Sequence, residues 1–209
     1  MRVVMVAAGE RPSDTLFRKY IEYCDKTIAI DKGVEVFIDN NVIPDYVVGD
    51  FDSVNEKYKD KINSFNIVKF PKEKDYTDSE IALNRAFRLD ADEIIMLGMT
   101  GKRIDHMLGN LGLLDISLRK GVKAYIIDDL NKIFLNDKSF SLEGNKGDIV
   151  SFYAYSSVVR NLNIKNAKYE LESYDLDPFE GLCNSNEFLL GDMHVSFDSG
   201  KLLVIYSRD

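Results

Sequence analysis

The chain has 209 residues, of which 45% are hydrophobic and 30% are charged, and its formal net charge at pH 7 is -8. This length suffices for one large domain or two smaller ones, and the hydrophobic fraction is enough to fill a core. The acidic balance, without a basic run, argues against nucleic-acid binding, and the apolar stretches are too short to span a membrane. Two cysteines and a short apolar start that runs into Gly9-Glu10-Arg11-Pro12 predict a soluble cytoplasmic protein with reduced thiols.

Short apolar runs alternate with helical patterns through residues 1–128. This alternation predicts a parallel sheet with helices on both faces, in a Rossmann-like three-layer α/β arrangement. The expected strands are Val3–Ala8, Thr27–Ile30, Tyr46–Val48, Ile67–Phe70, Glu93–Leu97 and Val122–Ile127. The expected helices run from Leu16 to Cys24, Asn55 to Asn63, Thr77 to Leu89 and Ile104 to Leu118.

The pattern changes near Asp128, after which short strand-like runs are separated by turn signals. These runs predict a small antiparallel sandwich or barrel over residues 129–209. The expected strands are Lys132–Leu135, Asp148–Tyr155, Val158–Ile164, Lys168–Leu171, His194–Phe197 and Leu202–Tyr206. The polar segment from Asp175 to Asn186 is expected to be a loop.

Carboxylates cluster in three loops of the first part. The clusters are Gly49-Asp50-Phe51-Asp52-Ser53, Lys74-Asp75-Tyr76-Thr77-Asp78-Ser79-Glu80 and Gly98-Met99-Thr100-Gly101-Lys102-Arg103-Ile104-Asp105-His106. Because such loops gather along one edge of an open parallel sheet, we expect the three to converge where ligands bind. Converging carboxylates repel one another unless a cation lies among them. The pattern therefore predicts a divalent metal and a phosphate-bearing substrate.

Asp50 and Asp52 are two residues apart, so their carboxylates point the same way on an extended backbone and can face one ion. Helix capping is the alternative, because Ser53 and Glu56 have the spacing of a capping box. Capping accounts for Ser53 and Glu56 but not for two aspartates before the cap. We therefore predict a functional role for both aspartates.

In the second cluster, Thr77 and Glu80 also have capping-box spacing, with Asp78 in the first turn. A helix N-terminus also attracts phosphate. Two roles therefore stay open for Thr77, as a cap or as a ligand of a phosphate oxygen. Asp75 and Asp78 are less well explained by capping, and Asp78 is a candidate ligand of a metal or a hydroxyl.

In the third cluster, two glycines permit close backbone approach to a ligand. Arg103 can bind phosphate in two-pronged fashion, and Lys102 can add a point charge. The segment is not a Walker A loop, because its glycines are too close together and Arg103 replaces Ser or Thr. His106 is more simply a helix-start residue bonded to a neighbour. With two histidines in the chain, a zinc site is disfavoured.

These blocks resemble the thiamine pyrophosphokinase (thiamine diphosphokinase) family, and the resemblance covers nearly the whole chain. Lys32 departs from the glycine that is frequent in the family at that position. The resemblance implies that Asp31, Asp75, Thr77, Lys102, Arg103 and Asn110 bind ATP. The matching blocks are Asp31-Lys32-Gly33 with Ile43 to Ser53, Lys74 to Leu83, and Arg103 to Leu111.

The C-terminal part matches the family less tightly. Lys168-Tyr169-Glu170-Leu171 resembles a block that places an aromatic residue against thiamine, and Ser185-Asn186-Glu187-Phe188 resembles a block whose serine lies beside it. In an alternative alignment, Gly181-Leu182-Cys183-Asn184 fills part of the second block, with Cys183 in place of the serine. The resemblance implies that Tyr169, Ser185 and Asn186 bind thiamine, with Tyr169 replacing the tryptophan of some relatives.

The resemblance also implies an N-terminal nucleotide-binding catalytic domain, residues 1–128, a thiamine-binding β-sandwich, residues 129–209, and a homodimer. The expected reaction transfers diphosphate from ATP to the hydroxyl of thiamine, giving thiamine diphosphate and AMP. Mg²⁺ is the expected cofactor, because it combines one or two carboxylates with phosphate oxygens and water. The candidates for its direct or water-mediated shell, and for catalysis, are Asp50, Asp52, Asp78 and Asp105. One of them, with Asp78 preferred, orients or deprotonates the hydroxyl.

Two other functions are compatible with parts of the sequence. Phe51 between two aspartates is superficially similar to the nucleophile motif of haloacid dehalogenase-type phosphohydrolases, although that motif follows the first strand of its domain and this one follows the third. A binding module for nucleotide or thiamine without turnover is the second alternative. The number of carboxylates argues against it, because a binder gains little from so many.

Overall fold

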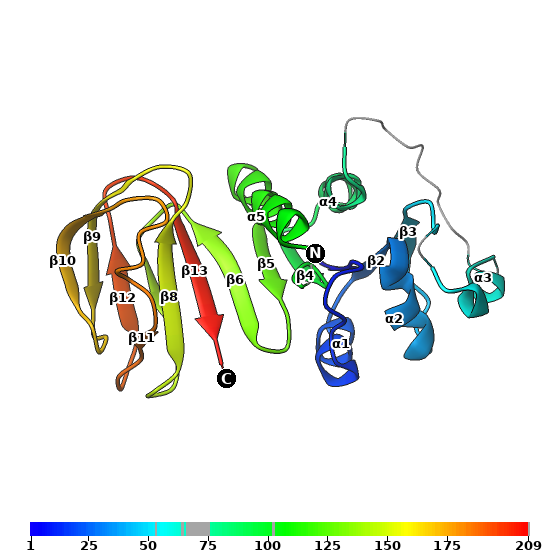
Figure 1. Cartoon of the computed structure of the whole chain (residues 1–209), viewed down its shortest axis with the longest axis horizontal. Helices are drawn as coiled ribbons and strands as arrows, with labels where there is room; N and C mark the ends of the chain where they lie inside the picture. Colours follow the sequence, from blue (N-terminus) through cyan, green and yellow to red (C-terminus); the bar gives the residue numbers. More distant parts are fainter. Residues whose placement is uncertain (53, 64, 66–75, 102, 209) are drawn as a thin grey trace. The chain divides into compact units, whose positions relative to one another are not determined.

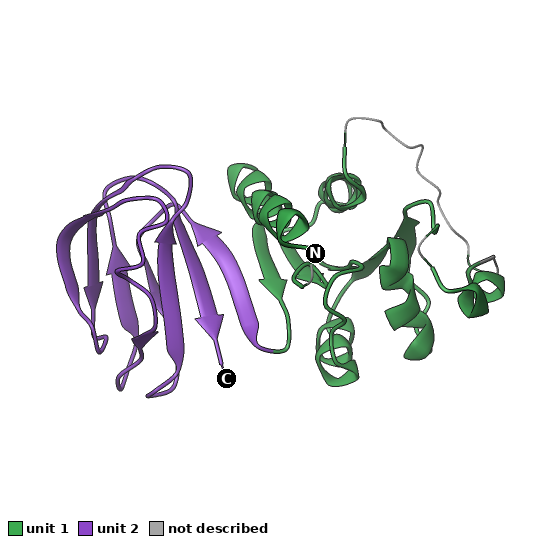
Figure 2. Ribbon diagram, in the orientation of Figure 1, with its two compact units in different colours: residues 1–129 green, residues 130–209 purple. Residues whose placement is uncertain are grey.

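The structure is a computed structural model that describes residues 1–52, 54–63, 65, 76–101 and 103–208. It divides into two compact units, Met1–Asp129 and Leu130–Asp209 (Figure 2). None of the described helices is both long and apolar enough to cross a membrane. The predicted strand Ile67–Phe70 and the predicted site residues Asp75 and Lys102 lie outside the described residues.

Parallel strands form the sheet of unit 1, as the alternating pattern predicted. Their order is β5-β4-β1-β2-β3, and each neighbouring pair is parallel. The strands are β1 (Arg2–Val6), β2 (Lys26–Ile30), β3 (Tyr46–Val48), β4 (Glu93–Leu97) and β5 (Lys123–Ile127). From β1 the chain proceeds outward to β2 and β3, and then returns to place β4 and β5 on the other side of β1. The order therefore reverses between β1 and β4, which is where ligands bind in open α/β sheets.

Helices cover both faces of this sheet, with α1 and α2 on one side and α4 and α5 on the other (Figure 1). The helices are α1 (Asp14–Ile21), α2 (Val34–Asp39), α3 (Glu56–Asn63), α4 (Asp78–Arg88) and α5 (Ile104–Arg119). On the first side, Phe17 of α1 and Phe37 of α2 meet edge to face with ring centroids 5.0 Å apart. They pack against strand residues that include Val4 and Val6 of β1. These two residues are two apart, so their side chains point to the same face of the sheet.

The sequence pattern did not predict α2 or the 3₁₀ turn η1 (Asp31–Gly33) that precedes it. The five residues from Val34 to Ile38 are all buried. A helix buried all round lacks the apolar stripe on which the prediction of helices relied. This element matters for the site, because it begins directly at the end of β2.

Unit 2 is an antiparallel β-sandwich, as expected. One sheet has the strand order β11-β8-β13-β6 and the other β10-β9-β12-β7, and buried residues of both sheets form its core. The strands are β6 (Asn131–Asn136), β7 (Phe140–Leu142), β8 (Ile149–Ala154), β9 (Val159–Lys165), β10 (Leu171–Leu176), β11 (Asn186–Glu187), β12 (Met193–Ser196) and β13 (Leu202–Ser207).

Two expectations for unit 2 were wrong in detail. The strand expected over Lys168–Leu171 begins only at Leu171, as β10. It runs to Leu176 and so includes the first two residues of the segment from Asp175 that was expected to be a loop. Lys168 and Tyr169 instead form a bend. The backbone of Tyr169 bonds to the side chain of Asn186 in β11.

Candidate active site

Main-chain atoms of two loops pair at the switch point between β1 and β4. The N–H of Gly9 donates to the carbonyl of Gly98 at 2.8 Å, and the N–H of Glu10 donates to the carbonyl of Thr100 at 2.7 Å. A Cβ on Gly9 would lie 2.2 Å from the Thr100 carbonyl oxygen, and one on Gly98 would lie 2.4 Å from the Ala7 carbonyl oxygen. Glycine is therefore required at both positions for this close approach.

A cavity of about 520 Å³, which we call the switch-point pocket, opens beside these loops. Its wall includes residues of both loops, the start of α2 and the start of α5. The residues that line it include Ala7, Gly9, Arg11, Asp31, Lys32, Glu35, Val36, Ser79, Gly98, Thr100, Arg103, His106 and Asn110.

A second cavity of about 690 Å³, the α4 pocket, shares four residues with the first. The shared residues are Asp31, Ser79, His106 and Asn110. The α4 pocket is otherwise lined by the N-terminal turns of α4 and α5, including Thr77, Asp78 and Asp105. The two cavities therefore lie side by side along the edge of the sheet where the predicted clusters were expected to meet.

Three aspartates from separate loops interact electrostatically at this edge. Burial, the charge of Asp78 with a hydrogen bond to it, and the charge of Asp50 raise the pKa of Asp31 to about 7, against a smaller lowering by a backbone hydrogen bond from Asp50. The structure thus brings the predicted residues Asp31, Asp50 and Asp78 together. It leaves them with excess negative charge that a cation would neutralise.

The loop after β3 is shaped around Asp31. Gly49 has φ +130°, and a Cβ there would lie 2.0 Å from Oδ1 of Asp31. Asp31 and Phe51 also have positive φ, +48° and +61°. Positive φ is uncommon for residues other than glycine and often marks functional sites.

Asp52 and Asp105 are placed differently from these three aspartates. Asp52 is exposed, and its backbone N–H donates to Oδ1 of Asp50 at 3.1 Å. Asp105 faces the α4 pocket and pairs with Arg103, 2.5 Å between Oδ2 and Nη2. The hydrogen bond and charge of Arg103 lower the pKa of Asp105.

Thr77 is the N-cap of α4. Its hydroxyl accepts from the N–H of Glu80 at 3.2 Å, and the Glu80 carboxylate accepts from the N–H of Thr77 at 2.8 Å. The capping box expected from the spacing is therefore present. Because Thr77 also lines the α4 pocket, capping does not preclude a phosphate contact.

Asn110 supports the glycine loop. Its side-chain N–H donates to the carbonyl of Met99 at 2.7 Å, which ties α5 to the loop after β4. Asn110 and His106 line both cavities. Asn110 was expected to bind ATP, which stays a prediction, and its observed bond holds the pocket wall.

The residues expected to bind thiamine lie in unit 2. Asn186, 2% exposed, accepts from the N–H of Tyr169 at 3.0 Å and donates to its carbonyl at 2.7 Å. Tyr169 is 59% exposed. The N–H of Ser185 donates to the hydroxyl of Ser151 at 3.0 Å. Cys183 is buried, and burial followed by the charge of Glu180 raises its pKa to about 11, so its thiol stays protonated at neutral pH.

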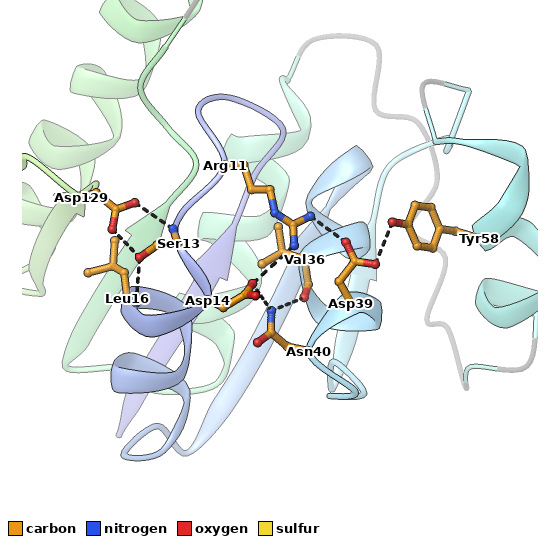
Figure 3. Close-up of polar contacts among 9 residues, drawn as sticks. All are labelled: Arg11, Ser13, Asp14, Leu16, Val36, Asp39, Asn40, Tyr58 and Asp129. Atoms are coloured by element: carbon orange, nitrogen blue, oxygen red, sulfur yellow. Dashed lines mark hydrogen bonds and ion pairs between the residues drawn. The ribbon is translucent and has the colours of Figure 1, made fainter.

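Arg11 was not identified from the sequence, although it lines the switch-point pocket. Its guanidinium donates to Asp39 at 2.9 Å and lies 3.5 Å from Asp14 (Figure 3). The hydroxyl of Tyr58 donates to the other oxygen of Asp39 at 2.8 Å. A single arginine in a polar loop carries no pattern, so the sequence offered no signal for this network.

Oxygen donors and excess negative charge suit Mg²⁺, which binds through one or two carboxylates plus phosphate oxygens. Asp31, Asp50 and Asp78 fit that chemistry. Among the described residues, no group of three or more His, Cys, Asp or Glu side chains is arranged as a ready metal site. Neither these three aspartates nor the four residues predicted as metal ligands, Asp50, Asp52, Asp78 and Asp105, therefore form a preassembled cluster among the described residues.

A parallel sheet with a cavity at its switch point, and carboxylates beside it, is typical of the α/β proteins that bind a ligand at this edge. Comparison with known proteins identifies which one. Residues 17–126 match the thiamin pyrophosphokinase catalytic domain, and residues 138–202 match the thiamin pyrophosphokinase vitamin B1 binding domain.

Relatives agree with these matches. The thiamine pyrophosphokinase of Bacillus subtilis (strain 168) is 33% identical over 187 residues, 87% of each chain. A crystal structure of thiamine pyrophosphokinase from Bacillus subtilis has a TM-score of 0.89 at 30% identity and covers 100% of both chains. One from Geobacillus thermodenitrificans has a TM-score of 0.86 at 27% identity, over 100% of this chain and 98% of that one. The chain belongs to the thiamin pyrophosphokinase family and is an enzyme, a diphosphotransferase.

Proposed function

We propose that the protein transfers diphosphate from ATP to the hydroxyl of thiamine in a Mg²⁺-dependent reaction, giving thiamine diphosphate and AMP. The observation that carries this proposal is that Asp31, which lines both adjoining cavities, interacts electrostatically with Asp50 and Asp78. Two cavities suit two substrates. Asp31 lines both of them, and Asp78 lines the α4 pocket. Family membership favours this reaction over the phosphohydrolase and over the binding module.

In this reaction the thiamine oxygen forms a bond to the β-phosphorus of ATP, and the bond from that phosphorus to the α–β bridging oxygen breaks. The hydroxyl proton passes to a carboxylate, and AMP leaves. We place the proton acceptor at Asp78, because it lines the α4 pocket beside Thr77 and interacts directly with Asp31. The carboxylates Asp31, Asp50 and Asp78 would hold Mg²⁺, which neutralises phosphate charge when bound.

Cationic side chains at the same cavities are available to the phosphates. Arg103 lines the switch-point pocket and is 67% exposed, so it can exchange Asp105 for phosphate at little cost. Tyr169 would stack on the thiazolium ring, with Asn186 fixing its backbone. We also propose that the chain acts as a homodimer in the cytoplasm. Exposed apolar side chains support the homodimer. The two free cysteines support the cytoplasmic location.

The experiment is a coupled assay with ATP, MgCl₂ and thiamine that quantifies AMP, inorganic phosphate and thiamine diphosphate separately. We expect AMP and thiamine diphosphate in equal amounts, and no inorganic phosphate. Asp50→Asn should lower kcat by at least about 100-fold, whereas Asp60→Asn, on the exposed side of α3, should leave it unchanged. Release of inorganic phosphate without AMP would indicate the hydrolase, and tight binding without products would indicate the binding module.

A further inference from the structure

Glu35 is a buried carboxylate that the proposed reaction does not use. It lies in the first turn of α2, is 9% exposed, and lines the switch-point pocket. A buried carboxylate is costly unless its oxygens find hydrogen-bond donors. Its surroundings therefore indicate what it binds.

One of the two carboxylate oxygens has a partner within the protein. Oε1 of Glu35 accepts from the backbone N–H of Asn55 at 2.8 Å, just before α3 begins. Within the described ranges, Oε2 has no hydrogen bond or ion pair, and the charge of Glu35 also acts on Lys57 of α3. The neighbouring cation Arg11 is engaged instead by Asp39 and Asp14 (Figure 3). Glu35 therefore presents an acceptor to the pocket.

Glu35 lies four residues after Asp31, along the wall of the switch-point pocket. The residues shared with the α4 pocket include Asp31, beside Asp50 and Asp78, which mark the phosphate end. Glu35 and Val36 lie outside that shared set. A fixed negative charge disfavours phosphate near Glu35, and an acceptor-only group requires a donor from the ligand. The uncharged donors of ATP are the ribose hydroxyls and the 6-amino group of adenine. The ribose lies nearer the phosphates, and Glu35 is only four residues from Asp31, so the 2′- and 3′-hydroxyls are the donors within reach.

We infer that Glu35 binds the ribose hydroxyls of the nucleotide and makes the enzyme selective for ribonucleotides over deoxyribonucleotides. This inference rests on the proposed function in placing ATP in the switch-point pocket. A comparable contact, an acidic residue on a ribose hydroxyl, serves dinucleotides at other switch points. In this chain the carboxylate comes from α2, the element that begins where β2 ends.

The test compares ATP, 2′-deoxyATP, 3′-deoxyATP and the analogue that lacks the 6-amino group of adenine. The wild-type protein should prefer ATP to each deoxy analogue by about 10- to 100-fold in Kd and in kcat/KM, the range expected for a hydrogen bond to a charged group. Glu35→Gln should weaken the binding of ATP but not of the deoxy analogues, and so reduce this preference to within about threefold. The KM for thiamine should not change.

Two controls separate recognition from structure. The amide introduced by Glu35→Gln keeps an oxygen for the N–H of Asn55, so Tm should change little. Glu56→Gln makes the same chemical change on α3, where the side chain is 84% exposed, and should keep the wild-type preference.

Several outcomes would overturn the inference. These are an unchanged ribose preference in Glu35→Gln, a loss of preference for the 6-amino group instead, or no nucleotide binding at millimolar concentration. Calorimetry measures the Kd of each nucleotide without thiamine, so the role of Glu35 is tested separately from the proposed transfer reaction. If ATP binds with a Glu35-dependent ribose preference but no AMP is released with thiamine, the proposed function fails and the role of Glu35 stands.

Discussion

At the scale of single residues, the site depends on glycine at position 49. Gly49 combines φ +130° with a side-chain position that Oδ1 of Asp31 occupies at 2.0 Å. Gly121 also has positive φ, +72°, but a Cβ there meets nothing within 4 Å. The two glycines therefore allow backbone strain to be separated from displacement of Asp31.

We predict that Gly49→Ala lowers kcat by at least about 100-fold, because Asp31 must move away from Asp50 and Asp78. Gly121→Ala should cost about 1 kcal/mol of unfolding free energy for the positive φ alone, with kcat unchanged. Urea unfolding and steady-state kinetics on both variants provide the measurement. Full activity in Gly49→Ala would show that the position of Asp31 is not critical.

The sequence predicted individual acidic residues better than their grouping. Asp50 and Asp78 were predicted from clusters, and the structure places both beside Asp31. It places Asp105 in the α4 pocket with Asp78, although Asp105 pairs with Arg103, and positive φ at Phe51 turns the backbone between Asp50 and Asp52. The expectation that Asp50 and Asp52 face one ion assumed an extended backbone, which positive φ at Phe51 interrupts. Backbone dihedrals of that kind leave no signal in residue types.

At the scale of elements, Asp45 fixes β3 to its neighbour β2. Its carboxylate accepts from Nζ of Lys26 at 2.7 Å and from the N–H and hydroxyl of Thr27, both at 2.9 Å. The backbone N–H of Asp45 in turn donates to the Thr27 hydroxyl at 2.8 Å. These bonds hold the start of β3, a strand of three residues, in register.

We predict that Asp45→Asn lowers the unfolding free energy at pH 7 by about 1–2 kcal/mol, a range reduced for partial exposure of the pair. Burial alone would raise the pKa of Asp45, but the bonds from Lys26 and Thr27 outweigh it, and the pKa is lowered. The stabilisation is therefore present above the unfolded pKa of ~3.9 and is lost as pH falls through the folded value. The difference between wild type and variant should shrink between pH 5 and pH 3 in urea titrations.

A constant difference across that pH range would contradict the assignment of this effect to the Asp45 carboxylate. Asp60→Asn removes an exposed carboxylate on α3 and serves as the control, with a change within about 0.5 kcal/mol.

Elements were predictable where their residues show a pattern. Continuous apolar runs indicated the strands of unit 1, and Thr77 with Glu80 indicated the start of α4. The element α2 was missed because Val34 to Ile38 are all buried, and β11 was missed because two residues carry no periodicity. The residues that line the switch-point pocket from α2, Glu35 among them, were missed with it.

At the scale of the whole molecule, each unit has its own core and also exposes large apolar side chains. In unit 2, Phe179 is 91% exposed and Leu190 is 81% exposed. Large exposed apolar side chains are typical of surfaces that bind another protein.

We predict that the purified chain sediments at twice the monomer mass. Phe179→Asp combined with Leu190→Asp should shift it to the monomer, because burying two carboxylates in an interface is unfavourable. Tyr23→Asp, which changes a 67% exposed aromatic residue at the end of α1, is the control and should remain dimeric. Sedimentation velocity measures all three, and a monomeric wild-type chain would refute the homodimer.

Close main-chain contacts at three glycines lie at or beside the switch-point pocket, which Gly9 and Gly98 line. A Cβ on Gly33, just before α2, would lie 2.0 Å from the Val6 carbonyl oxygen, tighter still than at Gly9 and Gly98. Substitution of these glycines would therefore displace the backbone around the pocket. A change of nucleotide preference would then have to come from the side chains that line the pocket. An inhibitor that contacts these glycines would leave few substitutions that confer resistance.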